Sequence, residues 1–192
     1  KRREYNIVVA QELWHHDGWH KLIGYGIVVH GCIDGATRSI IYTEAADNNR
    51  AATVYEIFHR SRGRILPHRV RGDRGGENIM IQRFMNAVRY PPPRVGYIPG
   101  RSVHNTRIES LWRHMRVQCT EFYMIFFEEL KLDHDEAGGG VVFLDCQNDE
   151  HLFVLHHMFI PLINESLDKW KGSWNNHKLR TENNRTPIQL MT

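Results

Sequence analysis

Residues 13–43, LWHHDGWHKLIGYGIVVHGCIDGATRSIIYT, decide the fold because they contain three strand-like segments in succession. The segments run from Leu13 to Asp17, from Gly24 to Cys32 and from Ser39 to Thr43. Asp34-Gly35, between the second and the third, is a typical hairpin turn signal. The stretch therefore predicts an antiparallel meander whose first strand ends at an aspartate.

Beyond the meander, helical segments alternate with short strands. Asn48 or Asn49 can cap a helix that runs to about Ser61. The later segments are a strand from Pro67 to Gly72, a helix from Glu77 to Tyr90 stopped by three prolines, and a strand from Arg94 to Ile98. This order predicts an α/β fold with a five-stranded mixed sheet flanked by helices.

The clearest helix follows the fifth strand. Its apolar residues recur at helical spacing and form one stripe: Ile108, Leu111, Trp112, Met115, Cys119 and Phe122. Glu109, Arg113 and Arg116 are spaced i, i+4, i+7 on the neighbouring face. We therefore expect a carboxylate and two guanidinium groups in one exposed line beside a buried stripe.

The last third of the chain predicts a helical extension to a single domain of residues 1–192. The core would occupy about residues 5–132, an acidic glycine-rich loop residues 133–150, and C-terminal helices residues 151–192. An apolar stripe in the extension is interrupted near Pro161: Leu152, Leu155, Phe159, Leu162 and Ile163.

Composition is that of a globular protein, with 41% hydrophobic and 24% charged residues. No run of about 18 apolar residues occurs, so we expect no membrane span. The three cysteines, Cys32, Cys119 and Cys146, show no CxxC spacing, which favours free thiols over disulfides or a zinc cluster.

Charge is distributed unevenly along the chain. Residues 60–116 contain thirteen Arg, no Lys and three acids, a local charge of 13 − 3 = +10. Residues 117–150 contain nine acids and one Lys, a local charge of 1 − 9 = −8. Arginine suits phosphate because its guanidinium fork can bind two oxygens, so the first stretch indicates contact with a polyanion. A solvated charged surface is the alternative.

Three acids lie where secondary structure alone does not require them. Asp17 lies at a strand end, Asp73 follows a strand, and Glu109 lies one turn into the amphipathic helix. Hard divalent cations such as Mg²⁺ prefer oxygen ligands. Two such ions about 4 Å apart can activate an attacking oxygen and stabilise a leaving oxygen at phosphorus. These acids are therefore the candidate metal ligands.

The blocks around these acids resemble the catalytic core of retroviral integrases and DDE transposases. They are WHHDG (14–18), RGDRGGEN (71–78) and HNTRIESLW (104–112). The 109 − 73 − 1 = 35 residues between the second and third acids match the family's interval. The segments GCIDGATRS (31–39), GYIPGRSVHN (96–105) and WNNHKLRTENNRTPIQL (174–190) are similar to its second strand, active-site loop and closing segment.

The resemblance implies an RNase H-like fold and a DNA integrase or transposase activity. Asp17, Asp73 and Glu109 would hold two Mg²⁺ or Mn²⁺ ions, with Asp17 bridging them. The family hydrolyses a phosphodiester bond at a DNA end and then transfers the 3′-OH into target DNA. The resemblance also implies that the protein needs no organic cofactor and that it assembles as a homodimer or larger oligomer. The implied function suggests a nuclear location.

The resemblance also implies which side chains bind DNA. Arg113 and Arg116 match basic positions of the family, and the active-site loop contributes Arg101, His104 and Asn105. We add Arg74, the neighbour of Asp73, to the expected DNA contacts. Trp112, Trp170 and Trp174 are interpreted as packing residues instead.

Several alternatives remain open at the level of residues. Asp34 could replace Asp17 as a ligand, but turns recruit aspartate for their own hydrogen bonds. Glu77 could touch a metal, although the first turn of a helix favours glutamate anyway. A zinc site at His15, His16 and His20 would lack the four placed ligands that tetrahedral zinc needs.

Two alternatives remain open at the level of function. The chain could be a domesticated core that binds DNA or protein without catalysis, a fate that usually removes one of the carboxylates. It could also be an RNase H-type nuclease that cleaves RNA–DNA hybrids. The interval of 35 residues and the closing segment favour the integrase reading over this nuclease.

Overall fold

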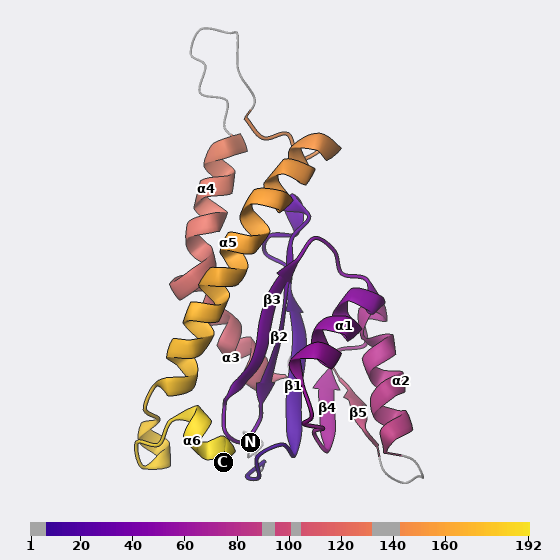
Figure 1. Cartoon of the computed structure of the whole chain (residues 1–192), viewed down its shortest axis with the longest axis vertical. Helices are drawn as coiled ribbons and strands as arrows, with labels where there is room; N and C mark the ends of the chain where they lie inside the picture. The colour runs from indigo at the N-terminus through magenta and orange to yellow at the C-terminus, as the bar shows by residue number, and fades with distance from the viewer. Residues whose placement is uncertain (1–6, 90–94, 101–104, 132–142) are drawn as a thin grey trace, which may run out of the picture.

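The computed structural model describes residues 7–89, 95–100, 105–131 and 143–192 (Figure 1). Its sheet has the strand order β3-β2-β1-β4-β5. The strands are β1 Leu13–Trp19, β2 Val28–Asp34, β3 Ile40–Ala46, β4 Arg69–Gly72 and β5 Tyr97–Pro99. The first three pair antiparallel, and β4 joins β1 and β5 in parallel. The predicted five-stranded mixed sheet is confirmed.

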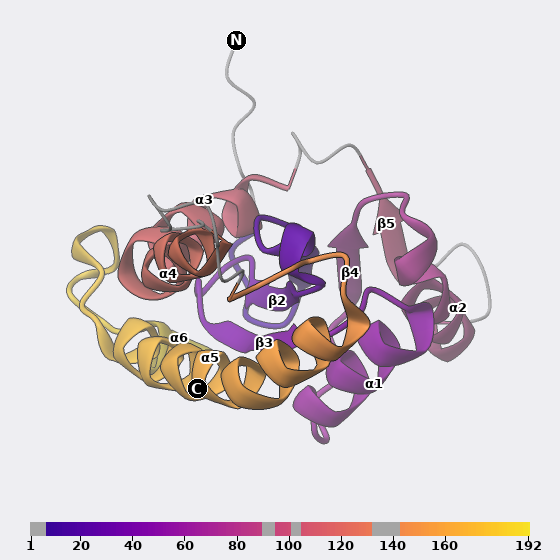
Figure 2. The same cartoon turned by 90° about the horizontal axis from the view of Figure 1, so that it is seen from above.

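Helices cover both faces of this sheet (Figure 2). They are α1 Ala51–Ser61, α2 Ile79–Val88, α3 Thr106–Met115, α4 Glu121–Lys131, α5 Asp149–Asn176 and α6 Pro187–Met191, with a π-helical turn at Arg116–Thr120 between α3 and α4. One hydrophobic core joins the sheet to α1 and α2, and another joins it to α3, α4 and α5. The residues of β1 alternate between them, with Trp14 in the first core and Trp19 in the second.

Two asparagines of α5 close the open edge of the sheet. Asn164 bonds both backbone groups of Ala45, at 2.7 and 3.1 Å, and Asn175 bonds those of Ile40, at 2.8 and 3.0 Å. Eleven residues of helix and five residues of strand both span about 16.5 Å, so the two amides reach matching points on β3. The edge strand thus has partners for backbone groups that would otherwise invite a foreign strand.

Four predicted boundaries were wrong. β1 does not end at Asp17 but continues to Trp19. β2 begins at Val28, because residues Ile23–Tyr25 form a 3₁₀ turn before it. The N-cap of α1 is Arg50, and neither predicted asparagine caps the helix. The extension is not broken at Pro161: α5 runs through it for 28 residues, and Leu162 is exposed.

The π-helical turn explains an error in the apolar stripe predicted from Ile108 to Phe122. Ile108 to Cys119 are buried as expected, but Phe122 is 66% exposed. A π turn contains an extra residue, so it rotates everything after it relative to an α-helix. Tyr123 and Phe127 occupy the buried face of α4 instead.

Other expectations hold. Trp112 and Trp170 are buried in the core, and all three cysteines are free.

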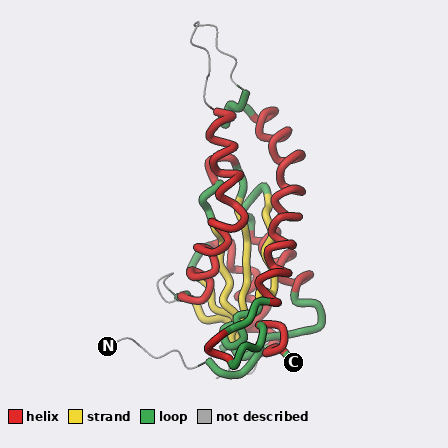
Figure 3. Tube along the Cα trace, turned by 90° about the vertical axis from the view of Figure 1, so that its left-hand side faces the viewer, coloured by secondary structure: helices red, strands yellow, loops and turns green. Residues whose placement is uncertain are grey.

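α4 and the start of α5 extend side by side past the ends of the strands (Figure 3). Within the described ranges, no helix combines the length and the apolar character needed to cross a membrane.

Candidate active site

Asp17 and Asp73 lie at the same end of the sheet, because the neighbouring strands β1 and β4 run parallel and both residues lie near their C-terminal ends. His15 pairs with Arg71, so residues 17 and 73, each two positions further along, lie at matching places. β4 ends at Gly72, immediately before Asp73. Both carboxylates are partly exposed. The meander and the strand after the first helix therefore place two acids side by side.

Trp112 connects α3, and with it Glu109, to the same edge. Its indole Nε1 donates a hydrogen bond to Asp17 Oδ2 at 3.0 Å. Gly31, which pairs with Asp17 in β2, leaves space for the ring: a Cβ there would lie 2.4 Å from Trp112 Cη2. Glu109 precedes Trp112 by three residues, so the two side chains lie on neighbouring sides of the helix. Glu109 itself is exposed.

The pKa of Asp17 is influenced by both of the other acids. Its pKa is raised to about 6. Burial is the largest cause, and the negative charges of Glu109 and Asp73 contribute to the same rise. The Trp112 hydrogen bond acts in the opposite direction, because it stabilises the charged carboxylate. Glu109 and Asp73, which lie in other parts of the chain, thus both influence the charge state of Asp17.

Asp73 is held by the loop that follows it. Its Oδ1 accepts hydrogen bonds from the backbone N–H of Gly75 at 3.0 Å and from Asn78 Nδ2 at 2.7 Å. Asn78 is buried, and its Oδ1 accepts from His16 Nε2 at 2.9 Å. Tyr42 then donates to His16 Nδ1 at 2.6 Å. A chain of hydrogen bonds through the sheet thus orients this carboxylate.

Glu77 is a fourth acid at the site, which the sequence analysis set aside. Asn78 Nδ2 also donates to Glu77 Oε1 at 3.0 Å, so one amide serves both Glu77 and Asp73. Burial raises the pKa of Glu77, and the nearby Asp73 adds to the effect. The pKa of Tyr97 is raised by burial and then by Asp73, Glu77 and Asp17. Asp17, Asp73 and Glu77 therefore all act on one buried phenol.

Asn105 fixes the start of α3 against β1. Its Oδ1 accepts from His15 Nδ1, and its Nδ2 donates to the backbone oxygen of His16 at 3.0 Å. Burial lowers the pKa of His15 to about 4, and the charges of Arg71 and Arg107 also lower it. Asn105 was expected in an exposed loop with a role in DNA contact. It is instead 3% exposed, with both ends of its amide used inside the protein.

The other residues expected to bind DNA have different positions. Arg74 is exposed beside Asp73 and lines a hollow of about 480 Å³ with Gln82 and Pro99. Arg113 is exposed one turn after Glu109, and Arg116 is exposed and forms an ion pair with Glu121 at 3.4 Å. Arg101 and His104 lie outside the described residues.

The alternatives to the three acids are also placed. Asp34 is fully buried, and its carboxylate accepts from four groups of its own turn and of Gln11, so it is a turn residue. His15 and His16 point to opposite faces of β1, toward Asn105 and Asn78. Trp112 was interpreted as a packing residue, and its hydrogen bond to Asp17 was missed. Its spacing from Glu109 was the available signal.

The donor set fits a hard divalent cation. It consists of carboxylate oxygens, and a bound cation would lower the pKa of Asp17, which burial and then the charges of Glu109 and Asp73 raise. Within residues 7–89, 95–100, 105–131 and 143–192, no three His, Cys, Asp or Glu side chains already stand in an arrangement that could hold a metal ion. The chemistry of Asp17, Asp73 and Glu109 thus suits a cation, but their side chains do not form a preformed metal site.

Comparison with known proteins agrees with this architecture. A family model described as "Integrase core domain" matches residues 4–192. The HTLV-2 integrase catalytic core domain, solved in complex with magnesium in a trimeric form, is similar in structure, with a TM-score of 0.59. The match covers 96% of this chain and 98% of that chain at 10% identity, which confirms the integrase-type, RNase H-like fold. No curated protein matches the sequence.

Proposed function

Because this chain belongs to the integrase core domain family, we propose that it is the catalytic core of a DNA integrase or transposase. It would hydrolyse a phosphodiester bond at a DNA end and transfer the resulting 3′-OH to target DNA. The reaction would use no covalent enzyme intermediate. Metal-dependent polynucleotidyl transfer by the acids of β1, β4 and α3 is the centre of the proposal.

One observation supports it above the others. The charges of Glu109 and Asp73 both raise the pKa of Asp17, although the three residues come from different parts of the chain. Like charges are held near each other only where another part of the structure compensates for the repulsion or where a cation binds. A pair of divalent ions would provide that compensation here.

The metal site would be formed by Asp17, Asp73 and Glu109, with Mg²⁺ or Mn²⁺ as the ions. When bound, two such ions activate the attacking oxygen and stabilise the leaving oxygen of an in-line displacement. The HTLV-2 integrase core is described in complex with magnesium, which supports this choice of metal.

The protein's own groups would orient the ligands and the DNA. Trp112 donates to one oxygen of Asp17, and the Gly18 backbone N–H also stabilises this carboxylate. Asn78 holds Oδ1 of Asp73 in the same way. Arg74, Arg113 and Arg116 are exposed near the acids and would bind phosphates of the DNA backbone. We further propose that two or more copies act together on two DNA ends in the nucleus.

The decisive test is Asp73→Asn, assayed with Mn²⁺ on duplex DNA that carries the ends of the parent element. The substitution keeps the size and hydrogen-bonding reach of the side chain but removes its charge. We expect strand transfer and end cleavage to fall at least a hundredfold with no loss of folded protein. Asp168→Asn, which alters an exposed acid on α5 that pairs with Lys171, is the matched control.

The same assay separates the remaining alternatives. Cleavage of an RNA–DNA hybrid in preference to duplex DNA would identify an RNase H-type nuclease. DNA binding by the unaltered chain with no metal-dependent cleavage would identify a domesticated binding domain. Unchanged activity in the Asp73→Asn variant would refute the assignment of the acids.

A further inference from the structure

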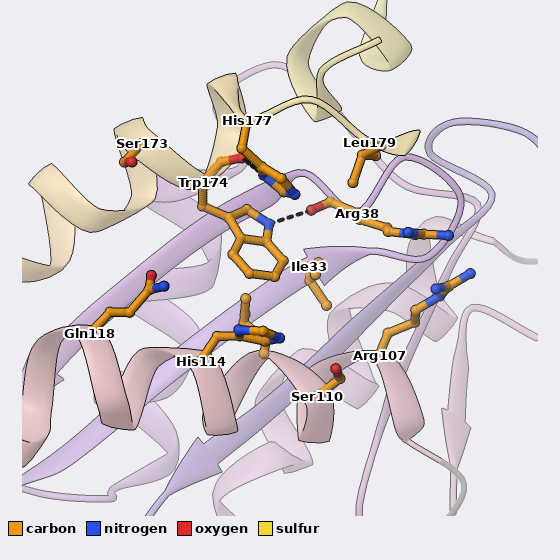
Figure 4. Close-up of a pocket in the computed structure, with 11 residues that line it drawn as sticks. Ile33, Arg38, Arg107, Ser110, His114, Gln118, Ser173, Trp174, His177 and Leu179 are labelled. Atoms are coloured by element: carbon orange, nitrogen blue, oxygen red, sulfur yellow. Dashed lines mark hydrogen bonds between the residues drawn. The ribbon is translucent and has the colours of Figure 1, made fainter. Parts of the chain in front are cut away.

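A polar pocket lies on the flank of α3 that faces away from the line of Glu109 and Arg113. Arg107, Ser110 and His114 line it from α3, at spacing i, i+3, i+7 (Figure 4). The turn between β2 and β3 forms one wall, and the end of α5 with the segment after it forms another. Its volume is about 470 Å³. The pocket and the candidate active site therefore share one helix but use separate faces of it.

The lining of this pocket is rich in cations and in hydrogen-bond donors. Its polar side chains include two arginines, two histidines and two serines: Arg38, Arg107, His114, His177, Ser110 and Ser173. No aspartate or glutamate belongs to the lining among the described residues. A cleft lined by one sign of charge concentrates ions of the opposite sign, so this composition favours an anionic ligand.

Arg38 and Arg107 extend their guanidinium groups toward the same side of the pocket (Figure 4). Burial, and then the positive charge of Arg107, lowers the pKa of Arg38. Two guanidinium groups placed this close repel one another. An anion between them would turn that repulsion into attraction and could accept from both forks.

Arg38 is held in place by an unusual backbone conformation. Its φ is +62°, in the left-handed region that costs energy for a residue with a Cβ. Its backbone oxygen accepts a hydrogen bond from Trp174 Nε1 at 2.9 Å, which fixes the turn against the end of α5. Strained conformations of this kind persist where the surroundings enforce them, and they concentrate at functional sites.

The protein itself satisfies Arg38 only in part. Its Nε is buried and has no acceptor among the residues that the structure describes. Its terminal nitrogen lies 3.7 Å from Glu182 Oε1, and the two side chains are 28% and 35% exposed. Such a long, solvent-screened ion pair contributes little. A stronger anion could therefore displace Glu182.

We propose that this pocket binds a phosphate group, either as a small phosphate or as a diester of a DNA backbone. A phosphate offers several oxygens to the guanidinium, imidazole and hydroxyl donors that surround the space. The pocket contains none of the acids of the candidate active site, so this proposal does not rest on the proposed function.

Binding can be measured by calorimetry and by the NMR signal of the Trp174 indole N–H. The probes are inorganic phosphate and a 12-base-pair DNA duplex, each in a chelator so that no metal ion contributes. Arg38→Gln should weaken binding about tenfold, because it removes charge-assisted hydrogen bonds. Glu182→Gln should strengthen binding severalfold, because it removes the competing carboxylate.

Arg60→Gln is the matched control, since Arg60 is an exposed arginine that pairs with Glu44 on another part of the surface. It should leave the Trp174 signal and the affinity for phosphate unchanged. Asp73→Asn should also retain phosphate binding, which separates this site from catalysis. Saturation by phosphate alone identifies a small ligand, and saturation by the duplex alone identifies a DNA contact.

Two results would overturn the proposal. One is that neither probe shifts the Trp174 signal. The other is that both Arg38→Gln and Glu182→Gln bind with the affinity of the unaltered chain. If Arg38→Gln fails to fold, the proposal can still be tested, because Glu182→Gln is expected to strengthen binding.

Discussion

At the scale of single residues, the buried histidines act as neutral supports for the acids. His16 donates through Nε2 to Asn78 and accepts at Nδ1 from Tyr42 when its ring is neutral. Burial lowers its pKa to about 4. Asn78 in turn donates a hydrogen bond to Asp73 and so orients its carboxylate. An uncharged hydrogen-bonded relay thus fixes a carboxylate without adding a positive charge beside it.

This relay predicts how stability depends on pH. The pKa of His16 is near 6.5 in the unfolded chain and about 4 in the fold, so the unfolded state binds the proton first. Its contribution is therefore present above pH 6.5 and is lost as the pH falls toward 4. In urea titrations, His16→Gln should lose about 2 kcal/mol less unfolding free energy between pH 7 and 5 than the unaltered chain.

The control for this experiment is His157→Gln, which changes an exposed histidine of α5. Glutamine keeps an N–H donor at the position of the imidazole but does not titrate. Asp17, whose pKa is raised, works in the opposite direction in all three proteins and cancels in the comparison. An equal pH dependence in all three proteins would show that His16 does not titrate as described.

At the scale of elements, the packing of α3 against β2 determines where Glu109 lies. Gly31 and Trp112 form the contact, and the indole then bonds to Asp17. The π-helical turn after α3 has a separate effect. It lets α3 orient its stripe for the sheet while α4 turns Tyr123 and Phe127 inward. α3 and α4 thus contribute different faces to the same hydrophobic core.

Gly31→Ala should disturb this contact. The added methyl group would lie 2.4 Å from Trp112 Cη2, so the ring and with it α3 must move. We expect a loss of about 1–3 kcal/mol in unfolding free energy and a fall in DNA cleavage larger than the loss of folded protein explains. Thermal unfolding and the strand-transfer assay measure the two effects.

Gly24→Ala is the control, because a Cβ at that position meets nothing within 4 Å. It should retain both stability and cleavage. If Gly31→Ala also retained both, the position of Trp112 would not depend on this contact.

At the scale of the whole molecule, the candidate site is formed by separate elements, which the sheet and the two hydrophobic cores hold in place. β1 and β4 supply Asp17 and Asp73, and α3 supplies Glu109. α5 secures the far edge of the sheet through Asn164 and Asn175. Because the acids stand on different elements, ions bound between them would cross-link the fold.

Divalent metal should therefore stabilise the protein as well as activate it. A ligand that binds only the folded state at a hundred times its Kd adds about 2.7 kcal/mol, which corresponds to several degrees for a chain of this size. Mn²⁺ should raise the unfolding temperature by that amount, and removal by a chelator should reverse it. Asp17→Asn should abolish most of the rise, and an equal rise in that variant would contradict the metal site.

Local patterns in the sequence were enough to predict the strands and the order of elements, and they singled out three acids as candidates. Alternating and helical spacing fix which residues are buried within an element, and this information is local. The same reasoning failed where contacts between different elements determine the local structure. It did not predict the π turn that exposes Phe122, the passage of α5 through Pro161, or the burial of Asn105.

The sequence by itself thus determined the family, through the spacing of its acidic blocks, and the type of sheet. Only the tertiary structure decided which groups hold the acids: Trp112 for Asp17, and Asn78 for Asp73. It also brought Arg38 and Arg107 to one pocket from positions 69 residues apart. Spacing along a chain records what one element buries, whereas contacts between elements depend on register and packing that arise only when the chain folds.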